Sequence, residues 1–114
     1  MSVSHNCPCT EACPLQHAME MIGGKWKLPI LCSLAMDGST RYNDLKRKLG
    51  GISNTMLAKS LKELEEDGLV TRTEYMEVPI RVEYQTTDKV KSLTPILVQL
   101  AQWAISADGE RLLH

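Results

Sequence analysis

Residues 41–67 read RYNDLKRKLGGISNTMLAKSLKELEED, and this stretch decides the fold. Its first part predicts a helix over about Arg41 to Leu49, because apolar side chains recur there at helical spacing. The glycine pair at 50–51 ends that helix and permits a tight change of direction. Ser53 is then a good N-cap for a second helix over roughly Asn54 to Asp67. Two short helices joined by a glycine turn form a helix-turn-helix.

Two more helices are predicted before this stretch. The first runs from Pro14, which suits the first position of a helix, to Ile22. The second runs from about Lys25 to Met36, and we expect it to start late or bend because Pro29 removes a backbone donor. Ser39 or Thr40 is a candidate cap for the helix that follows. The residues of the second helix that are expected to face the core are Trp26, Ile30, Leu31, Cys32, Leu34 and Ala35.

A hairpin and a long helix are predicted after the stretch. Val70–Met76 and Ile80–Thr86 are rich in β-branched and aromatic residues, as in the two strands of a hairpin with a short projecting loop. The last helix covers about Asp88 to Ala107, and Pro95 should kink it. The predicted fold class is therefore α+β and mainly helical: a winged helix-turn-helix with a two-stranded β-hairpin wing and a long C-terminal helix.

The composition is that of an ordinary globular protein, with 43% hydrophobic and 24% charged residues among 114. This length suits a single domain over 1–114, in which we expect 1–13 to form an irregular N-terminal arm. The first residues lack the basic start and apolar run of a secretory signal peptide. No apolar stretch approaches the roughly 20 residues of a membrane span, so we expect a cytoplasmic protein without membrane contact.

Basic residues are concentrated in one part of the chain, although the formal net charge is −1. Residues 24–62 hold eight basic and two acidic residues, whereas residues 63–114 hold five basic and ten acidic residues. Binding to phosphates needs a basic face rather than a basic protein, and this asymmetry could supply one. A solvated charged surface is the alternative explanation. The spacing of the side chains along the predicted helices therefore has to decide between a DNA-binding face and an ordinary surface.

The start of the helix at Asn54 carries short hydrogen-bonding side chains, and Lys59 continues the same face one turn later. A major groove about 12 Å wide admits a helix, and the N-terminal residues of that helix are best placed to touch base edges. Acidic residues crowd the other end, which should point away from the duplex. A capped surface helix is the alternative, but the glycine turn and the hairpin favour DNA binding. The candidate DNA-binding residues are Arg41, Ser53, Asn54, Thr55, Lys59 and Arg81.

The predicted wing carries two arginines. Arg81 lies next to the loop and could reach a phosphate or the minor groove, and Arg72 lies lower on the hairpin. Both could instead form cross-strand pairs with Glu74, Glu77 or Glu83. We favour pairing for Arg72 and DNA contact for Arg81.

The predicted last helix is apolar on more than one side, whereas a surface helix of one domain usually needs a single apolar stripe. The surplus predicts burial against a second copy, and helix-turn-helix dimers match half-sites about one turn of duplex apart. The alternative is that this helix is central to a small core. The candidate dimer-interface residues are Leu15, Met19, Ile96, Leu100 and Trp103.

The cysteines near the N-terminus permit two interpretations. Cys13 occupies the N-cap of the first helix, where the helix dipole favours the thiolate, and His17 lies one turn later. We hypothesise that Cys13 senses oxidants or electrophiles; an inert cysteine is the alternative. Cys7 and Cys9, with Cys13, His5 and His17, could also bind a metal, but their spacing is not that of a typical zinc site. We therefore predict no metal site.

No catalytic motif is recognisable. The sequence has no phosphate-binding glycine loop, no nucleophile elbow and no paired-histidine metal motif, so we predict no catalytic residue and no cofactor. The leading hypothesis is a dimeric transcriptional regulator that binds duplex DNA and is not an enzyme. Two alternatives stay open: a metal-responsive winged-helix regulator that uses the N-terminal cysteines, and a winged-helix protein-interaction module without a DNA role.

The sequence also resembles the HxlR family of bacterial winged-helix regulators, from about Cys13 to Trp103. The motifs that carry the resemblance are Cys13-Pro-Leu15, Ile22-Gly-Gly-Lys-Trp26, Gly51-Ile-Ser53, Met56-Leu57, Leu64-Glu-Glu-Asp-Gly-Leu-Val70, Glu77-Val-Pro79 and Arg81-Val-Glu-Tyr84. These motifs are specific in combination, though each is weak alone.

The resemblance implies a homodimer, built from the first and last helices, that binds palindromic operators through the helix at Asn54 and the wing. It also implies sensing of reactive species by a cysteine near the start of the first helix, a position that Cys13 matches. This chain departs from the family pattern at Thr55, where a basic residue is common, and at Ile80, where a second proline is common. These departures concern the operator sequence rather than DNA binding itself.

Overall fold

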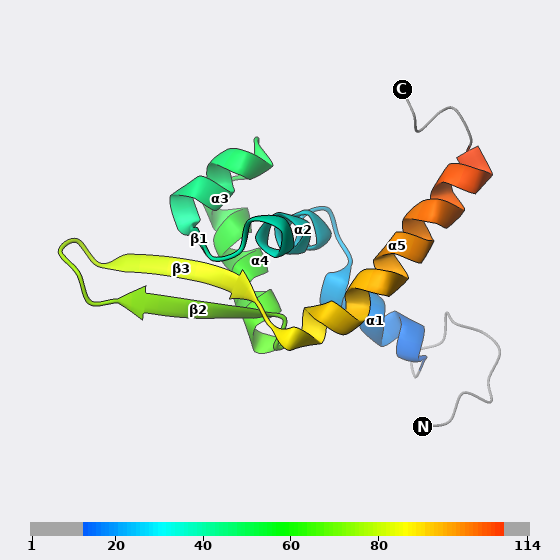
Figure 1. Cartoon of the computed structure of the whole chain (residues 1–114), viewed down its shortest axis with the longest axis horizontal. Helices are drawn as coiled ribbons and strands as arrows, with labels where there is room; N and C mark the ends of the chain where they lie inside the picture. The colour runs from blue at the N-terminus through cyan, green and yellow to red at the C-terminus, as the bar shows by residue number, and fades with distance from the viewer. Residues whose placement is uncertain (1–12, 109–114) are drawn as a thin grey trace.

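The structure is a computed structural model that describes residues 13–108 (Figure 1). It combines five helices with one small antiparallel sheet in this part of the chain. In chain order the elements are α1 (Pro14–Ile22), α2 (Lys27–Asp37), β1 (Thr40–Arg41), α3 (Tyr42–Leu49), α4 (Asn54–Glu66), β2 (Val70–Tyr75), β3 (Arg81–Thr86) and α5 (Asp88–Asp108). The predicted winged helix-turn-helix with a long C-terminal helix is confirmed.

The turn between α3 and α4 and the start of α4 form as the sequence predicts. Gly50 and Gly51 both adopt positive φ, which lets the chain turn sharply between α3 and α4. The hydroxyl oxygen of Ser53 accepts a hydrogen bond from the backbone N–H of Met56 at 3.1 Å and so caps α4. Helix α2 starts late, as predicted, and Pro29 lies in its first turn, where its missing N–H costs little.

The sheet has three strands in the order β1-β3-β2, rather than the two that the sequence predicts. The extra strand, β1, pairs with β3 so that Thr40 is opposite Tyr84. The predicted capping of α3 by Ser39 or Thr40 is wrong for the same reason. Thr40 is a strand residue whose hydroxyl donates to the carbonyl oxygen of Gly38 at 2.8 Å, and Arg41 occupies the N-cap position.

A single apolar core lies between the helices and the base of the hairpin. Helix α4 supplies three of its fully buried side chains, Leu57, Leu61 and Leu64, at the spacing of one helix face. The other buried members are Ile30, Leu31, Leu34, Leu45, Ile52, Leu69, Val70, Tyr84 and Val90. Helix α4 is therefore fixed by packing along most of its length, which gives its exposed face a defined orientation.

The wing and α5 extend from opposite sides of this core (Figure 1). Helix α5 continues through Pro95 and has Val90 as its one buried residue within the described part of the chain. Cys32 and Ala35 are exposed, so their predicted core positions are wrong. They border an apolar groove of about 300 Å³ between α2 and α5. Helix α5 does not cover this side of α2. Within residues 13–108, no helix is long and apolar enough to cross a membrane.

Candidate nucleic-acid interface

The exposed face of α4 begins with the short polar side chains that the sequence singled out. Ser53, Asn54 and Thr55 are exposed at its N-terminal end, and Lys59 is exposed one turn later. The opposite face is buried in the core. This end of α4 therefore presents hydrogen-bonding groups and free backbone N–H groups to solvent on a rigid support.

Tyr42 of α3 braces the start of α4. Its hydroxyl donates to the backbone carbonyl oxygen of Asn54 at 3.1 Å and lies 3.4 Å from the side-chain Oδ1 of the same residue. Partial burial raises the pKa of Tyr42, and the nearby Tyr84 raises that pKa further. Sequence reasoning missed this contact, because an aromatic residue at helical spacing predicts core packing and nothing more.

An ion pair connects the C-terminal half of α4 with α2. The ammonium of Lys27 lies 3.1 Å from a carboxylate oxygen of Glu63 and donates to the backbone carbonyl oxygen of Glu20 at 3.0 Å. The Lys27 side chain is 13% exposed and that of Glu63 is 40% exposed, so solvent screens the pair in part. One side chain of α2 thus connects the end of α1 with the C-terminal half of α4.

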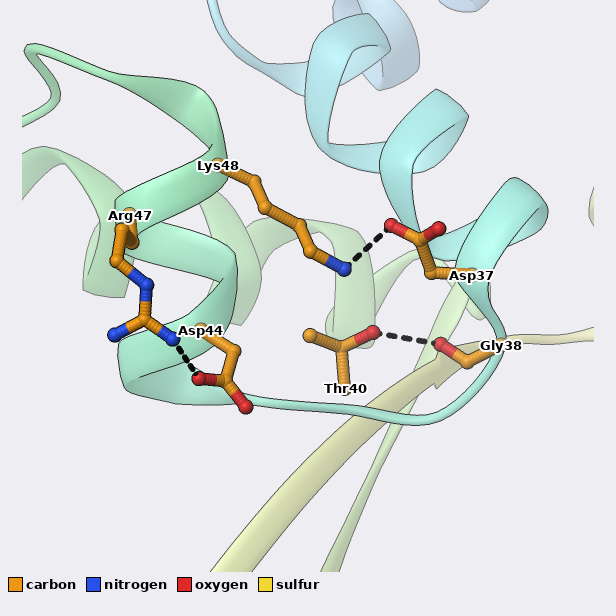
Figure 2. Close-up of polar contacts among 6 residues, drawn as sticks. All are labelled: Asp37, Gly38, Thr40, Asp44, Arg47 and Lys48. Carbon is orange, nitrogen blue, oxygen red and sulfur yellow. Dashed lines mark hydrogen bonds and ion pairs between the residues drawn. The ribbon is translucent and has the colours of Figure 1, made fainter.

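Several basic residues of the 24–62 stretch are neutralised by partners within the fold (Figure 2). Lys48 pairs with Asp37 at 2.6 Å and fastens α3 to the end of α2, and Arg47 pairs with Asp44. Five cations of this stretch form no ion pair among the residues that the structure describes: Lys25, Arg41, Lys46, Lys59 and Lys62. All of these except Lys46 are also exposed, so a phosphate could serve as their counterion.

The arginines of the wing are paired. Arg72 lies 2.8 Å from a carboxylate oxygen of Glu74, so the predicted pairing is confirmed. The predicted cross-strand geometry is wrong, because both residues belong to β2. Arg81, which was predicted to contact DNA, lies 3.1 Å from both Glu77 and Glu83. Pairing with these residues is the alternative that the sequence left open for Arg81.

A further contact holds Arg81 against the neighbouring strand, and Glu83 links the wing to the turn before β1. Its guanidinium carbon lies 4.1 Å from the ring centroid of Tyr75 on β2, a cation–π distance. Glu83 also accepts a hydrogen bond from the hydroxyl of Ser39 at 2.6 Å, which connects the wing with the turn before β1. A cleft of about 550 Å³ separates the wing from α3 and is lined on one side by residues 41–44 and on the other by 77 and 79–82.

Cys13 occupies the predicted N-cap of α1 and is 5% exposed. Its backbone carbonyl accepts a hydrogen bond from the N–H of His17, but its side chain makes no capping hydrogen bond. The His17 ring lies 3.8 Å from Glu20 on the exposed side of α1. Cys7, Cys9 and His5 lie outside the described residues. Within residues 13–108, no group of three or more His, Cys, Asp or Glu side chains is placed to bind a metal ion.

The five residues predicted to form a dimer interface are all exposed in the single chain. They come from α1 and α5, which lie together along a small apolar pocket. The residues are Leu15, Met19, Ile96, Leu100 and Trp103. Val98 and Ile105 of α5 are exposed as well. Large apolar side chains are therefore exposed on both of these helices.

The HxlR-like helix-turn-helix family matches residues 21–110. This chain belongs to that family. A relative from Halalkalibacterium halodurans, described as an uncharacterized HTH-type transcriptional regulator, is 48% identical over 92 residues, which span 81% of each chain. YdzF of Bacillus subtilis, described in the same way, is 37% identical over 87% of this chain and 91% of its own.

Solved structures of HxlR-like proteins have the same architecture as this family member. The oxidized form of the redox regulator HypR is 39% identical, with a TM-score of 0.73 over 82% of this chain and 96% of its own. The reduced form of the transcriptional regulator YodB from B. subtilis is 33% identical, with a TM-score of 0.77 over 85% of this chain and 95% of its own. The predicted resemblance to HxlR-type regulators is confirmed.

Proposed function

We propose that this HxlR family member is a cytoplasmic, homodimeric, sequence-specific DNA-binding regulator that performs no catalysis. The observation that carries the proposal is the face of α4. Its N-terminal end exposes Ser53, Asn54 and Thr55 together with the unpaired cation of Lys59, while its acidic end is held by Lys27. A helix with this polarity suits insertion of its N-terminal end into the major groove. Arg41, exposed on β1, would contact a neighbouring phosphate.

Dimerisation through α1 and α5 would give the regulator two copies of α4. The exposed apolar side chains of these helices, such as Ile96, Leu100 and Trp103, support this arrangement because burial would remove them from water. A twofold dimer reads the same base sequence on both strands, so the operator would be palindromic.

Cys13 is the residue that we propose for redox sensing, and HypR and YodB support this because the first is described as a redox regulator and the second has been solved after diamide treatment. The thiolate sulfur would attack one oxygen of a hydroperoxide and break the O–O bond. The sulfur loses two electrons and becomes a sulfenic acid, while the other oxygen takes a proton and leaves as an alcohol or water.

The position of Cys13 suggests how its oxidation would change DNA binding. Its side chain is buried at the start of α1, so an added oxygen has little room there and displaces the helix. Helix α1 contacts α4, and the ammonium of Lys27 bonds to both. A displaced α1 would therefore change how α4 is held.

The DNA-binding proposal is tested by titrating a duplex from the protein's own upstream region across a salt series. Replacement of Lys59 by Gln should weaken binding and lower the log–log salt slope by about 0.9, the value for one lost phosphate contact. The matched control is Lys91→Gln, which removes an exposed lysine of α5 that pairs with Asp88. A protein that binds no duplex at low salt would be an interaction module instead.

The redox proposal is tested with the same duplex after exposure to a hydroperoxide. Wild type should lose affinity, and Cys13→Ser should keep it. The matched control is Cys32→Ser, because Cys32 is the exposed thiol of the described chain. Equal loss in wild type and both variants would assign the effect to another group, and zinc-dependent binding would favour the N-terminal cysteine cluster as a metal site.

A further inference from the structure

A basic groove of about 300 Å³ lies between the turn that joins α1 to α2 and the side of α4. Its charged lining consists of Lys25, Lys27, Lys59 and Glu63. Lys27 pairs with Glu63, whereas Lys25 and Lys59 form no ion pair among the described residues. Two ammonium groups therefore give this groove a positive charge that the fold does not neutralise. The DNA contacts proposed above use Lys59 and give Lys25 no role.

Lys25 stands on a turn whose two ends are fixed. Before it, the N–H of Gly23 donates to the carbonyl oxygen of Met19 at 2.7 Å at the end of α1. After it, the ammonium of Lys27 bonds to α1 and to α4. The Lys25 ammonium lies 5.1 Å from the ring centroid of Trp26, which packs against the core. The ring restricts the Lys25 side chain, so less conformational entropy is lost when the ammonium binds an anion.

The groove borders the face of α4 that is proposed to enter the major groove. Successive side chains of a helix are rotated by about 100°, so the edge of α4 that carries Met56 and Glu63 lies almost opposite Asn54. Thr55 and Lys59, both exposed, lie between these two edges. The groove is lined by Met56, Lys59 and Glu63, so it follows the edge of this face that is remote from Asn54.

An exposed cation without an ion-pair partner in the described chain lies at each edge of this face. Arg41 lies at the first edge, because it precedes Tyr42, whose hydroxyl donates to the backbone of Asn54. Lys25 lies at the second edge, across the groove from Lys59. The major groove is about 12 Å wide and a helix nearly fills it, so one DNA strand runs along each side of an inserted helix. Arg41 and Lys25 are therefore placed for opposite strands.

We propose that Lys25 binds a backbone phosphate of the operator, on the strand that follows this groove and next to the phosphate that Lys59 contacts. This inference rests on the proposed DNA binding of α4 and adds a second element, the turn over residues 23–26, to the interface. The occupant is a phosphate because the free groups of the groove are ammonium ions, and such contacts set the register of the duplex without reading its bases. Trp26 is a positioning residue that keeps the Lys25 ammonium near its ring.

The test uses the full chain and a duplex that the wild type selects from a random-sequence library. Lys25→Gln should weaken binding and lower the log–log salt slope by about 0.9, and the double variant with Lys59→Gln should lower it by about 1.8. Lys25→Arg keeps the charge and should keep the slope. The base preference of Lys25→Gln should equal that of the wild type, because a phosphate contact carries no sequence information.

Two controls accompany these variants. Lys91→Gln removes an exposed lysine of α5 that pairs with Asp88, and it should bind as the wild type does. Lys25 is exposed, so its replacement should leave the fold intact, and thermal unfolding of each variant checks this.

A second measurement locates the phosphate. In a set of duplexes, each phosphate that flanks the α4 site is replaced in turn by an uncharged methylphosphonate. One replacement should weaken binding by the wild type about threefold, as for an exposed ion pair, and leave Lys25→Gln unaffected. That variant has already lost the contact. The neighbouring replacement should have no effect on Lys59→Gln.

Three results would overturn the inference: a wild-type salt slope in Lys25→Gln, an altered base preference in that variant, or equal sensitivity of variant and wild type to every methylphosphonate. The last would attribute a lower slope to the overall charge of the protein rather than to one contact. Each of these results differs from failure of the proposed function, in which the wild type selects no duplex from the library.

Discussion

Helices α4 and α5 are the two longest of the described chain, and they relate to the core in opposite ways. Helix α4 buries Leu57, Leu61 and Leu64 and carries a side-chain cap at its start. Helix α5 has 21 residues, yet Val90 is the only one of them that is buried within the described structure. The first helix is stabilised by its own chain, whereas the second leaves most of its apolar surface in solvent.

The difference indicates that α4 is stabilised by folding of the single chain, whereas the free face of α5 can be stabilised only by assembly with a second surface. A helix that is packed along one face has a fixed orientation in the monomer, which suits a surface that must match the major groove. A helix with apolar side chains on its free face gains stability only when a second surface covers it. Under the proposed function, the single chain would fix α4 for recognition and leave the free face of α5 for dimerisation.

The largest effect should come from α4, the helix that is packed against the core. Leu57→Ala removes a fully buried side chain of α4 and should lower the free energy of unfolding by about 2–5 kcal/mol, through lost burial and the cavity that remains. Urea unfolding measures the change. Leu100→Ala is the control, because that α5 side chain is half exposed in the monomer. Equal losses at a concentration where the protein is monomeric would contradict the comparison.

The second-largest effect concerns the exposed apolar side chains of α5. Trp103 is 67% exposed on α5, and Trp103→Ala should weaken self-association by about 2 kcal/mol, or roughly thirtyfold. Sedimentation equilibrium gives the dissociation constant. Met76→Ala removes an even more exposed apolar side chain from the wing and should leave that constant unchanged. If both variants dimerise like the wild type, α5 is not the interface.

A smaller effect is expected at the start of α4. Ser53→Ala removes the acceptor for the backbone N–H of Met56 and should cost about 1 kcal/mol of stability. Thermal unfolding measures this cost. Ser92→Ala serves as the control, since that hydroxyl donates to the carbonyl of Lys89 within α5 and caps no helix start. A cost at Ser92 as large as that at Ser53 would show that the cap adds nothing.

The smallest effect is a pH dependence. Burial and Tyr84 raise the pKa of Tyr42 in the folded state above its unfolded value of 10.0. Folding then favours the protonated phenol, so this contribution to stability is complete below pH 10 and is lost as the pH rises through the higher folded value. Urea unfolding should show a decline above pH 10 that is shallower in Tyr42→Phe. Parallel declines in the two proteins would assign the titration to another group.

The elements that the sequence predicted well are those with strong local signals. Ser53 caps α4 because a hydroxyl before an apolar periodic run has a nearby donor to satisfy. Pro29 delays α2 because proline lacks a backbone donor. Both effects act within one turn of helix, so neighbouring residues suffice to predict them.

The elements that the sequence mispredicted depend on distant partners. Strand β1 has two residues and exists because β3 lies beside it, a pairing with no local pattern. Cys32 and Ala35 fit the apolar spacing of α2, but α5 leaves their side of the helix open. For Arg81, sequence position alone could not decide between phosphate and the carboxylates of Glu77 and Glu83.

The ammonium of Lys27, which bonds to the end of α1 and to Glu63 of α4, has a consequence for the oxidation of Cys13. Coupling between two sites is reciprocal, so if oxidation at Cys13 loosens α4, then DNA that holds α4 in place also disfavours oxidation at Cys13. At equilibrium, a regulator bound to its operator would hold Cys13 in the reduced form more strongly than one free in solution. If Cys13 is the sensor, a stronger oxidising potential would then be needed to oxidise the bound molecules than the unbound ones.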